Sequence, residues 1–403
     1  MDWSFLPEIP STLSQPVLVG LLLATGLLAG EAVRRYAALP RIIGYVLGGV
    51  VLGPYGTGLL SAHALESARV LVDLSIGLIV FELGFRLDFD WLRRNRWLLV
   101  TAIAESLFSF WAIYLALRYF EFRPLLAASA AAIGTATSPA VVMLVSHELR
   151  AEGQITERML LFTAVNSVFA YVALTLLLPF LHIEHQAIWQ VALLHPLYLL
   201  GGSALAGLVS CVVMVRLAAW LGKREDRQFV LLVAMIVLTV GAARALNLSV
   251  LVALIALGML ARNLDARHAL MPLGFGAGGQ LFFVILFVLT GASLEVGALG
   301  SAGLAVAAFI AARFLGKALA LLAFGRPSGL RPGGAGLLAL ALLPMSGLAV
   351  VMVLDTQALY PGFGGELAAV VLSAVAVLEI LGPIATQFAL KRAGEADPAA
   401  TGG

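Results

Sequence analysis

Two apolar stretches carry a proline near their centre: AIGTATSPAVV at residues 132–142 and LALLPMSGLAVV at residues 340–351. A proline inside a helix removes a backbone hydrogen bond and clashes with the carbonyl of the preceding turn. In lipid such a break is tolerated where the freed groups find partners or line a cavity. We therefore predict two broken helices around one ion site, with Pro139, Pro344 and Gly347 at the breaks. The alternative is a pair of ordinary proline kinks.

The composition is that of a membrane protein. Hydrophobic residues make up 61% of the 403 residues and charged residues only 12%, against about 25% charged residues in soluble proteins. Apolar runs of about 20 residues, long enough to cross a bilayer, recur from residue 17 to residue 390. The net charge of +2 does not indicate a nucleic-acid partner, and the single Cys211 excludes a disulfide framework. We expect no enzymatic activity, no cofactor and no metal site, because the six His residues fall mostly in loops or at helix ends.

The apolar runs predict an all-α polytopic membrane protein with about thirteen transmembrane helices. They occupy residues 17–36, 40–58, 70–88, 97–118, 124–147, 157–180, 188–216, 227–245, 248–262, 274–294, 301–324, 333–354 and 367–390. With the N-terminus outside, most of the 25 Lys and Arg residues fall on the inner side, together with the C-terminus. This bias fits the inner (plasma) membrane of a bacterium.

The segments also predict the organisation of the chain. We expect an extracytoplasmic segment at 1–16, a transmembrane transporter domain at 17–390 and a cytoplasmic disordered tail at 391–403, with no soluble domain. Three pairs of intramembrane features lie 205, 208 and 213 positions apart: Pro139 and Pro344, Glu105 and Arg313, and Asn166 and Glu379. This spacing predicts two inverted repeats, at about 17–180 and 227–390, joined by a linker helix at 188–216.

Arg313 is the intramembrane charge that most needs a partner. A charge at mid-bilayer costs about 2.5–3.5 kcal/mol on insertion scales, and a guanidinium does not escape this cost by losing its proton. Glu105 and Glu379 are the acceptors predicted near the depth of Arg313. Lys317, one turn closer to the cytoplasm, is expected to extend its amine to the membrane surface. Glu82 either faces a second subunit or pairs locally.

A neutral polar spot interrupts another apolar stretch, LLFTAVNSVFAYVAL at residues 160–174. Asn166 and Ser167 stand side by side at its centre. Together with Ser346 of the second break, they are candidates for binding an ion or substrate.

Four further stretches resemble, in this order, the Kef-like branch of the monovalent cation:proton antiporters, which carry a sodium/hydrogen exchanger domain. They are ALPRIIGYVLGGVVLGP at 38–54, LVDLSIGLIVFELGFRLDF at 71–89, LFFVILFVLTGASLEV at 281–296 and RFLGKALA at 313–320. The resemblance covers nearly the whole membrane region. It implies a sodium/proton antiporter-like fold, a homodimer, a scaffold with a moving core, and exchange of Na⁺ or K⁺ for H⁺. No C-terminal nucleotide-binding regulatory domain is expected.

The resemblance also assigns roles to particular residues. Thr137, Ser138 and Pro139 match the family's unwound stretch, and Arg313 matches its basic residue. Exchange in the family depends on an Asp in the sixth helix, which Asp, Asn or Gln usually precedes. Asn166 matches the first position of that pair, but Ser167 stands where the carboxylate is expected.

If the protein exchanges protons, this departure requires a displaced carboxylate. Ser does not titrate near neutral pH, so another residue would then carry the proton. The candidates are Glu379 or Glu105, followed by Glu82, with Arg313 as the charge partner of the one that is used.

The sequence therefore predicts a secondary active transporter that exchanges a monovalent cation for H⁺ by alternating access. Two other functions stay open. The same fold could carry another solute, such as an organic anion attracted by Arg313, or the protein could be a transport-inactive sensor or assembly protein.

Overall fold

The computed structural model describes residues 15–61, 65, 68–184, 189–265, 276–293, 303–345 and 347–397. All regular secondary structure in these residues is helical, as predicted. The helices are α1 (Gln15–Ala37), α2 (Arg41–Leu52), α4 (Arg69–Phe85), α5 (Phe89–Arg94), α6 (Arg96–Tyr119), α7 (Pro124–Thr135), α8 (Pro139–Glu148), α9 (Gln154–Glu184), α10 (Trp189–Leu197), the π-helical turn η1 (Tyr198–Gly202), α11 (Ser203–Leu221), α12 (Glu225–Ala245), α13 (Val250–Leu264), α14 (Gly276–Ala292), α15 (Gly303–Phe324), α16 (Gly334–Ala341), α17 (Gly347–Leu359) and α18 (Pro361–Arg392).

Each of the thirteen predicted segments overlaps one helix or a run of two or three consecutive helical elements. The segment at 124–147 divides into α7 and α8, and the segment at 333–354 divides into α16 and α17. Both divisions fall at the predicted prolines. The prediction of two broken helices is therefore confirmed.

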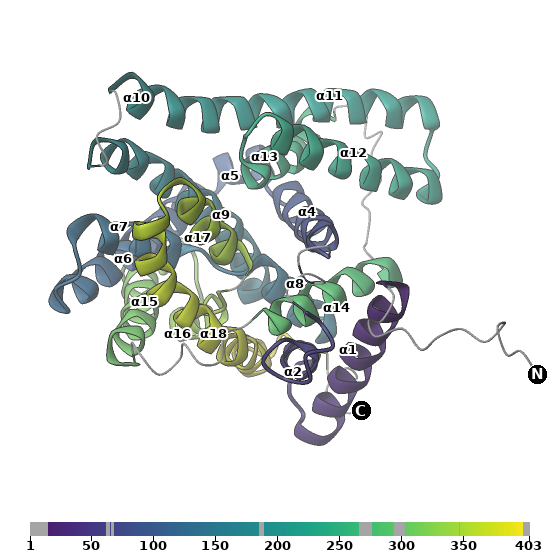
Figure 1. Ribbon diagram of the computed structural model, residues 1–403, viewed down its shortest axis with the longest axis horizontal. Coiled ribbons are helices and arrows are strands. Elements are labelled where there is room, and N and C mark those ends of the chain that lie inside the picture. The colour runs from purple at the N-terminus through teal and green to yellow at the C-terminus, as the bar shows by residue number, and fades with distance from the viewer. Residues whose placement is uncertain are drawn as a thin grey trace, which may run out of the picture.

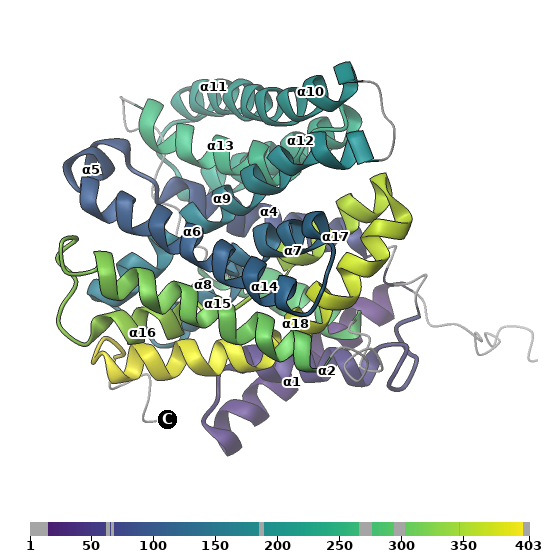
Figure 2. The ribbon, with the colours of Figure 1, turned by 90° about the vertical axis from the view of Figure 1, so that its left-hand side faces the viewer.

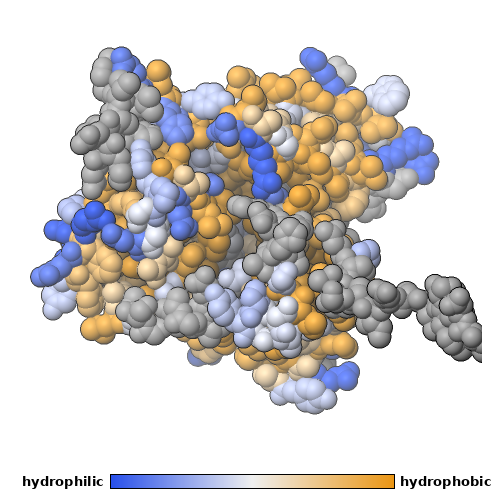
Figure 3. All heavy atoms as spheres, viewed as in Figure 1, coloured by the Kyte–Doolittle hydropathy of each residue, from blue (hydrophilic) through white to orange (hydrophobic). Residues whose placement is uncertain are grey.

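Many of the helices suit a membrane. Eight apolar stretches, each of at least 18 residues, are long and apolar enough to cross one, and four shorter apolar helices accompany them. Large apolar side chains such as Leu28, Leu205 and Trp220 are exposed on the outside of the bundle. Much of the face in Figure 3 is correspondingly hydrophobic. Lipid is the surrounding that such a surface suits.

The helices lie in layers (Figures 1 and 2). The group α11–α13 lies at one side and α1, α2, α16 and α18 lie at the other, with α4, α8 and α9 between them. Close packing within this bundle uses small residues, as is common between membrane helices. At the crossing of α2 and α14, a Cβ on Gly49 would lie 2.1 Å from the Val288 carbonyl oxygen. A Cβ on Gly291 would lie 2.2 Å from that of Val46.

The first broken helix lies deep in the bundle. In the stretch Pro124–Glu148, which contains α7 and α8, 94% of the most apolar window is buried. In the other candidate spans this share is at most 61%. The break is therefore surrounded by protein rather than by lipid, which places polar groups where other parts of the chain can reach them.

The end of the chain differs from the prediction. Helix α18 continues to Arg392, and residues 393–397 fold back against the connection between α8 and α9. The expectation of a disordered tail is wrong for residues 391–397, because backbone and side-chain hydrogen bonds hold this segment in place. Residues 398–403 lie outside the described part of the chain.

Candidate functional site

The two helix breaks meet in the centre of the bundle. The Ser138 backbone N–H donates to the Pro344 carbonyl (2.9 Å), and the Thr137 hydroxyl contacts the Leu342 carbonyl (3.2 Å). Pro139 is the first residue of α8, a position that tolerates proline because no intrahelical partner is lost there. The Ser138 side chain accepts from the Val141 N–H (3.4 Å) and so caps α8.

Arg313 of α15 compensates for the backbone hydrogen bonds that both breaks lose. Its side chain is fully buried, and it donates to the Gly134 carbonyl at the end of α7. It also contacts three carbonyls of the second break, those of Leu342 (3.2 Å), Leu343 (3.4 Å) and Pro344 (3.2 Å). These carbonyls are the negative ends of the half-helix dipoles, where a cation is stabilising. The guanidinium thus holds the crossing together.

The predicted ion pair of Arg313 with Glu105 or Glu379 is not formed. Within the described residues, the hydrogen bonds of the guanidinium go to carbonyl oxygens and, at 3.5 Å, to the Thr137 hydroxyl. The physical reason is the number of donors: a planar group with five N–H bonds matches a cluster of unpaired carbonyls. Its direct contacts are therefore with carbonyl dipoles and not with a carboxylate.

Lys317 forms the ion pair with Glu105. Both side chains are fully buried, so the expected extension of Lys317 to the membrane surface is wrong. The ammonium also lies 3.4 Å from the Thr135 carbonyl and 3.4 Å from the Thr137 hydroxyl. Because Lys317 follows Arg313 by four residues, both cations lie on one face of α15. Three oxygen atoms therefore surround the ammonium at the break.

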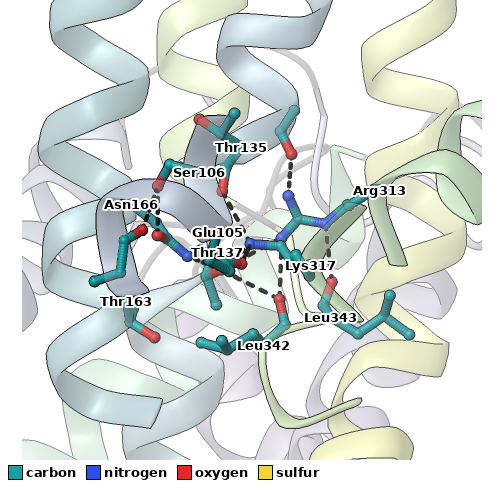
Figure 4. A network of polar contacts seen from close by, with 12 residues as sticks. Glu105, Ser106, Thr135, Thr137, Thr163, Asn166, Arg313, Lys317, Leu342 and Leu343 are labelled. Carbon is teal, nitrogen blue, oxygen red and sulfur yellow. Dashed lines mark hydrogen bonds and ion pairs between the residues drawn. The ribbon is translucent and has the colours of Figure 1, made fainter. Parts of the chain in front are cut away.

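Asn166 of α9 joins the same network (Figure 4). Its amide nitrogen donates to the Thr137 hydroxyl (3.2 Å), and its amide oxygen accepts from the Ser106 hydroxyl (2.7 Å). All three side chains are buried. Asn166, one of the candidate binding residues, thus contacts the first break, whereas Ser106 was not among the predicted residues. Its position directly after Glu105 was the available signal.

Ser167 is buried but directs its hydroxyl elsewhere. It donates to the carbonyl of Thr163 one turn earlier in α9 (2.7 Å). This bond occupies the single donor of the hydroxyl, and it is a common way for Ser to satisfy itself within an apolar helix. The contact with the first break is made by its neighbour Asn166.

Glu379 is the second carboxyl group in the buried region. Its side chain is fully buried, and neither of its oxygens has a hydrogen-bond partner among the described residues. It lies one turn before Gly382, where a Cβ would come within 2.7 Å of the Pro344 Cα. One turn after Gly382, the Thr386 hydroxyl contacts the Ala341 carbonyl (3.2 Å). Glu379 therefore belongs to the face of α18 that packs on the second break.

The remaining predicted residues lie apart from this network or outside the described chain. Glu82 of α4 forms a local ion pair with Arg86, the residue that directly follows this helix (2.9 Å). Gly347 is the first residue of α17, at the predicted break. Ser346 lies outside the described residues.

The arrangement suits a monovalent cation and a proton more than a transition metal. No group of three His, Cys, Asp or Glu residues that could hold a metal ion occurs in the described chain. The available ligands are oxygens of a carboxylate, a hydroxyl, an amide and a carbonyl, which are hard donors. One oxygen of Glu105 has no hydrogen-bond partner in the described structure, so the carboxylate has capacity for another ligand.

Comparison with known proteins identifies the family. The family model described as "Sodium/hydrogen exchanger, transmembrane" matches residues 18–392. No curated protein sequence matches the chain.

Two solved structures of the sodium proton antiporter MjNhaP1 from Methanocaldococcus jannaschii have a similar fold. The first, at pH 8, has a TM-score of 0.64 and 16% identity and covers 94% of this chain and 95% of that chain. The second, from an EM map, has a TM-score of 0.63 and 19% identity, and the match covers 99% of this chain and 100% of that chain.

These findings confirm the predicted antiporter-like fold, and they confirm that the chain is a transporter and not an enzyme. The chain is a multi-pass membrane protein that belongs to the sodium/hydrogen exchanger family.

Proposed function

We propose that this protein exchanges a monovalent cation for H⁺ across a membrane, with Glu105 as the carboxylate that binds the cation. The observation that carries the proposal is the buried Lys317–Glu105 ion pair beside the crossing of the two breaks. The Lys317 ammonium is itself a monovalent cation, and oxygens of Glu105, Thr135 and Thr137 contact it. A transported ion that takes its place meets the same ligands.

The coordination of the transported ion follows from the network. The Thr135 carbonyl and the Thr137 hydroxyl are the neutral ligands, because both contact the ammonium that the ion replaces. The Asn166 amide positions Thr137 by donating to its hydroxyl (Figure 4). When Lys317 leaves, the Thr137 hydroxyl loses one of the three donors that contact it, and those of Asn166 and Arg313 remain. Arg313 stays with the backbone carbonyls, which keeps the crossing intact while the ion pair exchanges its partner.

Glu379 is the proposed proton carrier. A buried carboxylate without hydrogen bonds or an ion pair is very costly in its ionised form. We assign its ionised form to the state in which a cation is bound at the crossing of the two breaks, because a nearby positive charge favours a carboxylate. A bound cation then favours release of the proton from Glu379, and a proton on Glu379 weakens binding of the cation, which is the coupling that exchange requires. The replacement of the family's Asp by Ser167 is compensated in this proposal by two carboxylates on other helices.

Several finer features belong to the same proposal. We assign the chain to the Kef-like branch, to a homodimer and to two inverted repeats, with the N-terminus outside and the C-terminus in the cytoplasm. The motifs at 38–54 and 313–320, the matched breaks and the basic bias of the loops support these assignments. The plasma membrane is the compartment that this bias fits best.

Transport of an organic anion is less consistent with the geometry. This alternative requires Arg313 to attract the anion. Both terminal nitrogens of Arg313 and its Nε contact backbone carbonyls instead. Lys317 is neutralised by Glu105. An anion would have to displace several hydrogen bonds at the helix crossing to reach either cation.

Reconstituted vesicles test the proposal. A pH gradient is imposed, Na⁺, K⁺ or Li⁺ is added, and internal pH is recorded for the wild type, Glu105→Gln and Glu379→Gln. A monovalent cation should dissipate the gradient in the wild type and in neither variant. Glu366→Gln is the matched control, because Glu366 forms an exposed ion pair with Arg123 away from the breaks (2.7 Å).

The experiment distinguishes failure of the proposed antiport from failure of the proposed carboxylates. A wild-type protein that responds to no monovalent cation excludes antiport and favours the transport-inactive alternative. Full activity in both carboxylate variants excludes the assignment of the carboxylates but leaves antiport in place.

A further inference from the structure

The end of the chain binds the start of α9. After α18, the carboxylate of Glu395 accepts hydrogen bonds from the backbone N–H of Ile155 and of Thr156, each at 2.8 Å. It also accepts from the Thr156 hydroxyl (2.8 Å). The first backbone N–H groups of a helix have no partner within the helix. A residue 240 positions away in the sequence therefore caps α9.

Backbone hydrogen bonds extend this contact to the connection between α8 and α9. The Glu152 N–H donates to the Glu395 carbonyl (2.9 Å), and the Asp397 N–H donates to the Leu149 carbonyl (2.9 Å). The Asp397 carboxylate lies 3.8 Å from the Arg150 guanidinium. We call residues 394–397, with these contacts, the C-terminal clamp.

A glycine directly before α9 leaves room for the clamp. Gly153 has a φ angle of +156°, and a Cβ on it would lie 2.3 Å from the Glu395 Cδ. Three hydrogen bonds hold this carboxylate, so it does not move aside easily. The negative charge also lies at the positive end of the α9 dipole, where it is stabilising. The Glu395 carboxylate therefore lies where the α9 dipole is positive and where the missing Cβ of Gly153 leaves room for it.

The clamp connects the elements that carry the central network. Helix α9 holds Asn166, and α18 holds Glu379. Helix α8 begins at the first break. All three elements converge on the clamp, because α8 ends, α9 begins and α18 ends next to it. A shift of the start of α9 moves the whole helix and changes the distance of Asn166 from Thr137.

We propose that the C-terminal clamp positions α9, and that Glu395 is a positioning residue for the cation site. The inference rests on the proposed exchange function, but its structural part stands separately. Without the clamp, α9 loses the cap at its first turn, and the Asn166 amide no longer contacts Thr137 in a fixed geometry. The affinity for the transported cation falls, whereas the exchange machinery itself stays complete.

Two pairs of variants test the clamp. A chain shortened after Arg392 lacks it, whereas a chain shortened after Asp397 keeps every contact described above. Glu395→Gln retains the size of the side chain but removes its charge and one acceptor oxygen. Glu366→Gln is the matched control, because it removes a carboxylate charge from an exposed ion pair with Arg123 that lies outside the clamp. Amide hydrogen exchange at Ile155 and Thr156 and the KM for the cation are measured in each.

The shortened chain and Glu395→Gln should exchange the Ile155 and Thr156 amides about 5–30-fold faster than the wild type, as expected for the loss of a helix cap. Their KM should rise severalfold, and both controls should match the wild type. A general loss of stability would lower the maximal rate and leave KM unchanged. Full protection of these amides in the chain that ends at Arg392 overturns the clamp. Lost protection with an unchanged KM overturns the positioning role.

The clamp can be tested separately if the wild type transports no cation. That result removes the proposed function, and amide exchange across residues 154–166 then decides the clamp. Faster exchange throughout this range in Glu395→Gln supports the positioning of α9, and exchange identical to that of Glu366→Gln refutes it.

Discussion

Lys317, and not Arg313, neutralises Glu105 at the crossing of α6 and α15. The two cations stand one turn apart on the same helix, yet their partners differ in kind. Arg313 contacts backbone carbonyls of both helix breaks, and Lys317 contacts a carboxylate. The guanidinium is a structural element of the crossing, and in the proposed mechanism the ammonium is the charge that the transported cation replaces. This division leads to separate expectations for the two residues.

Replacement of Lys317 by Met should destabilise the protein strongly. It leaves Glu105 buried without an ion-pair partner, and loss of one partner from a buried pair costs about 3–5 kcal/mol. The double variant Glu105→Leu with Lys317→Met should recover most of this loss, because no charge is left unpaired. Thermal unfolding of the purified proteins in detergent measures both effects. A double variant as unstable as the single one would contradict the proposed pairing.

Replacement of Arg313 by Lys should also lower stability, although the charge is kept. An ammonium has three donors on one atom and does not span the carbonyls of Gly134 and Leu343 together. Each buried carbonyl left without a donor costs about 1–3 kcal/mol. The expected Tm decrease should exceed that of Arg326→Lys, a control at an exposed residue where the connection between α15 and α16 begins. Equal Tm values for the two variants would show that the carbonyl contacts contribute little.

The sequence predicted the membrane helices and both breaks because these features are local. Apolar length defines a span, and Pro139 and Pro344 break their helices through clashes with the preceding turn. The clamp at Glu395 was not predictable in the same way. Its partners Ile155 and Thr156 lie some 240 positions away, and only the packing of α9 and α18 brings them together.

The site was predicted in part for a similar reason. The intramembrane position of Glu105 and Arg313 follows from the apolar runs around them. Which of two cations on one face of α15 reaches Glu105 depends on the rotation and distance of α6, which local sequence does not determine. The orientation of the Ser167 hydroxyl was not predictable either, because the sequence does not determine that it donates to the Thr163 carbonyl.

Gly316 controls the distance between α6 and α15. A Cβ at this position would lie 2.7 Å from the Phe108 carbonyl oxygen and 2.7 Å from the Ser109 Cα. We expect Gly316→Ala to separate the two helices, to weaken the Lys317–Glu105 pair and to destabilise the protein by about 1–3 kcal/mol. Gly241→Ala is the control, because nothing lies within 4 Å of its added Cβ. Equal Tm values for the two variants would show that the close approach of α6 and α15 at Gly316 contributes little to stability.

Asn166 and Ser167 should respond differently to truncation. Asn166→Ala removes the contacts with Thr137 and Ser106, so cation-dependent proton release in vesicles should fall at least about tenfold, the effect of roughly 1.4 kcal/mol. Ser167→Ala removes only a bond to its own helix and should retain most of the activity. Loss of activity in Ser167→Ala with activity retained in Asn166→Ala would reverse the assignment and restore Ser167 as a ligand.

Glu379 should be dispensable for stability and required for exchange. Its two oxygens have no hydrogen-bond partner within the described chain, so replacing the carboxyl group leaves no other polar group unpaired. An apolar side chain of similar size is expected to be neutral or stabilising at such a position. We therefore expect Glu379→Leu to have a Tm equal to or above that of the wild type, while a pH gradient in vesicles no longer responds to added cation. Glu379→Asp, which keeps the titratable group, should retain measurable exchange and serves as the control. A Glu379→Leu protein that unfolds at a much lower temperature would show that the carboxyl group has a structural partner. Normal exchange in this variant would transfer the proton to Glu105, where the same carboxylate would have to bind both ions in turn.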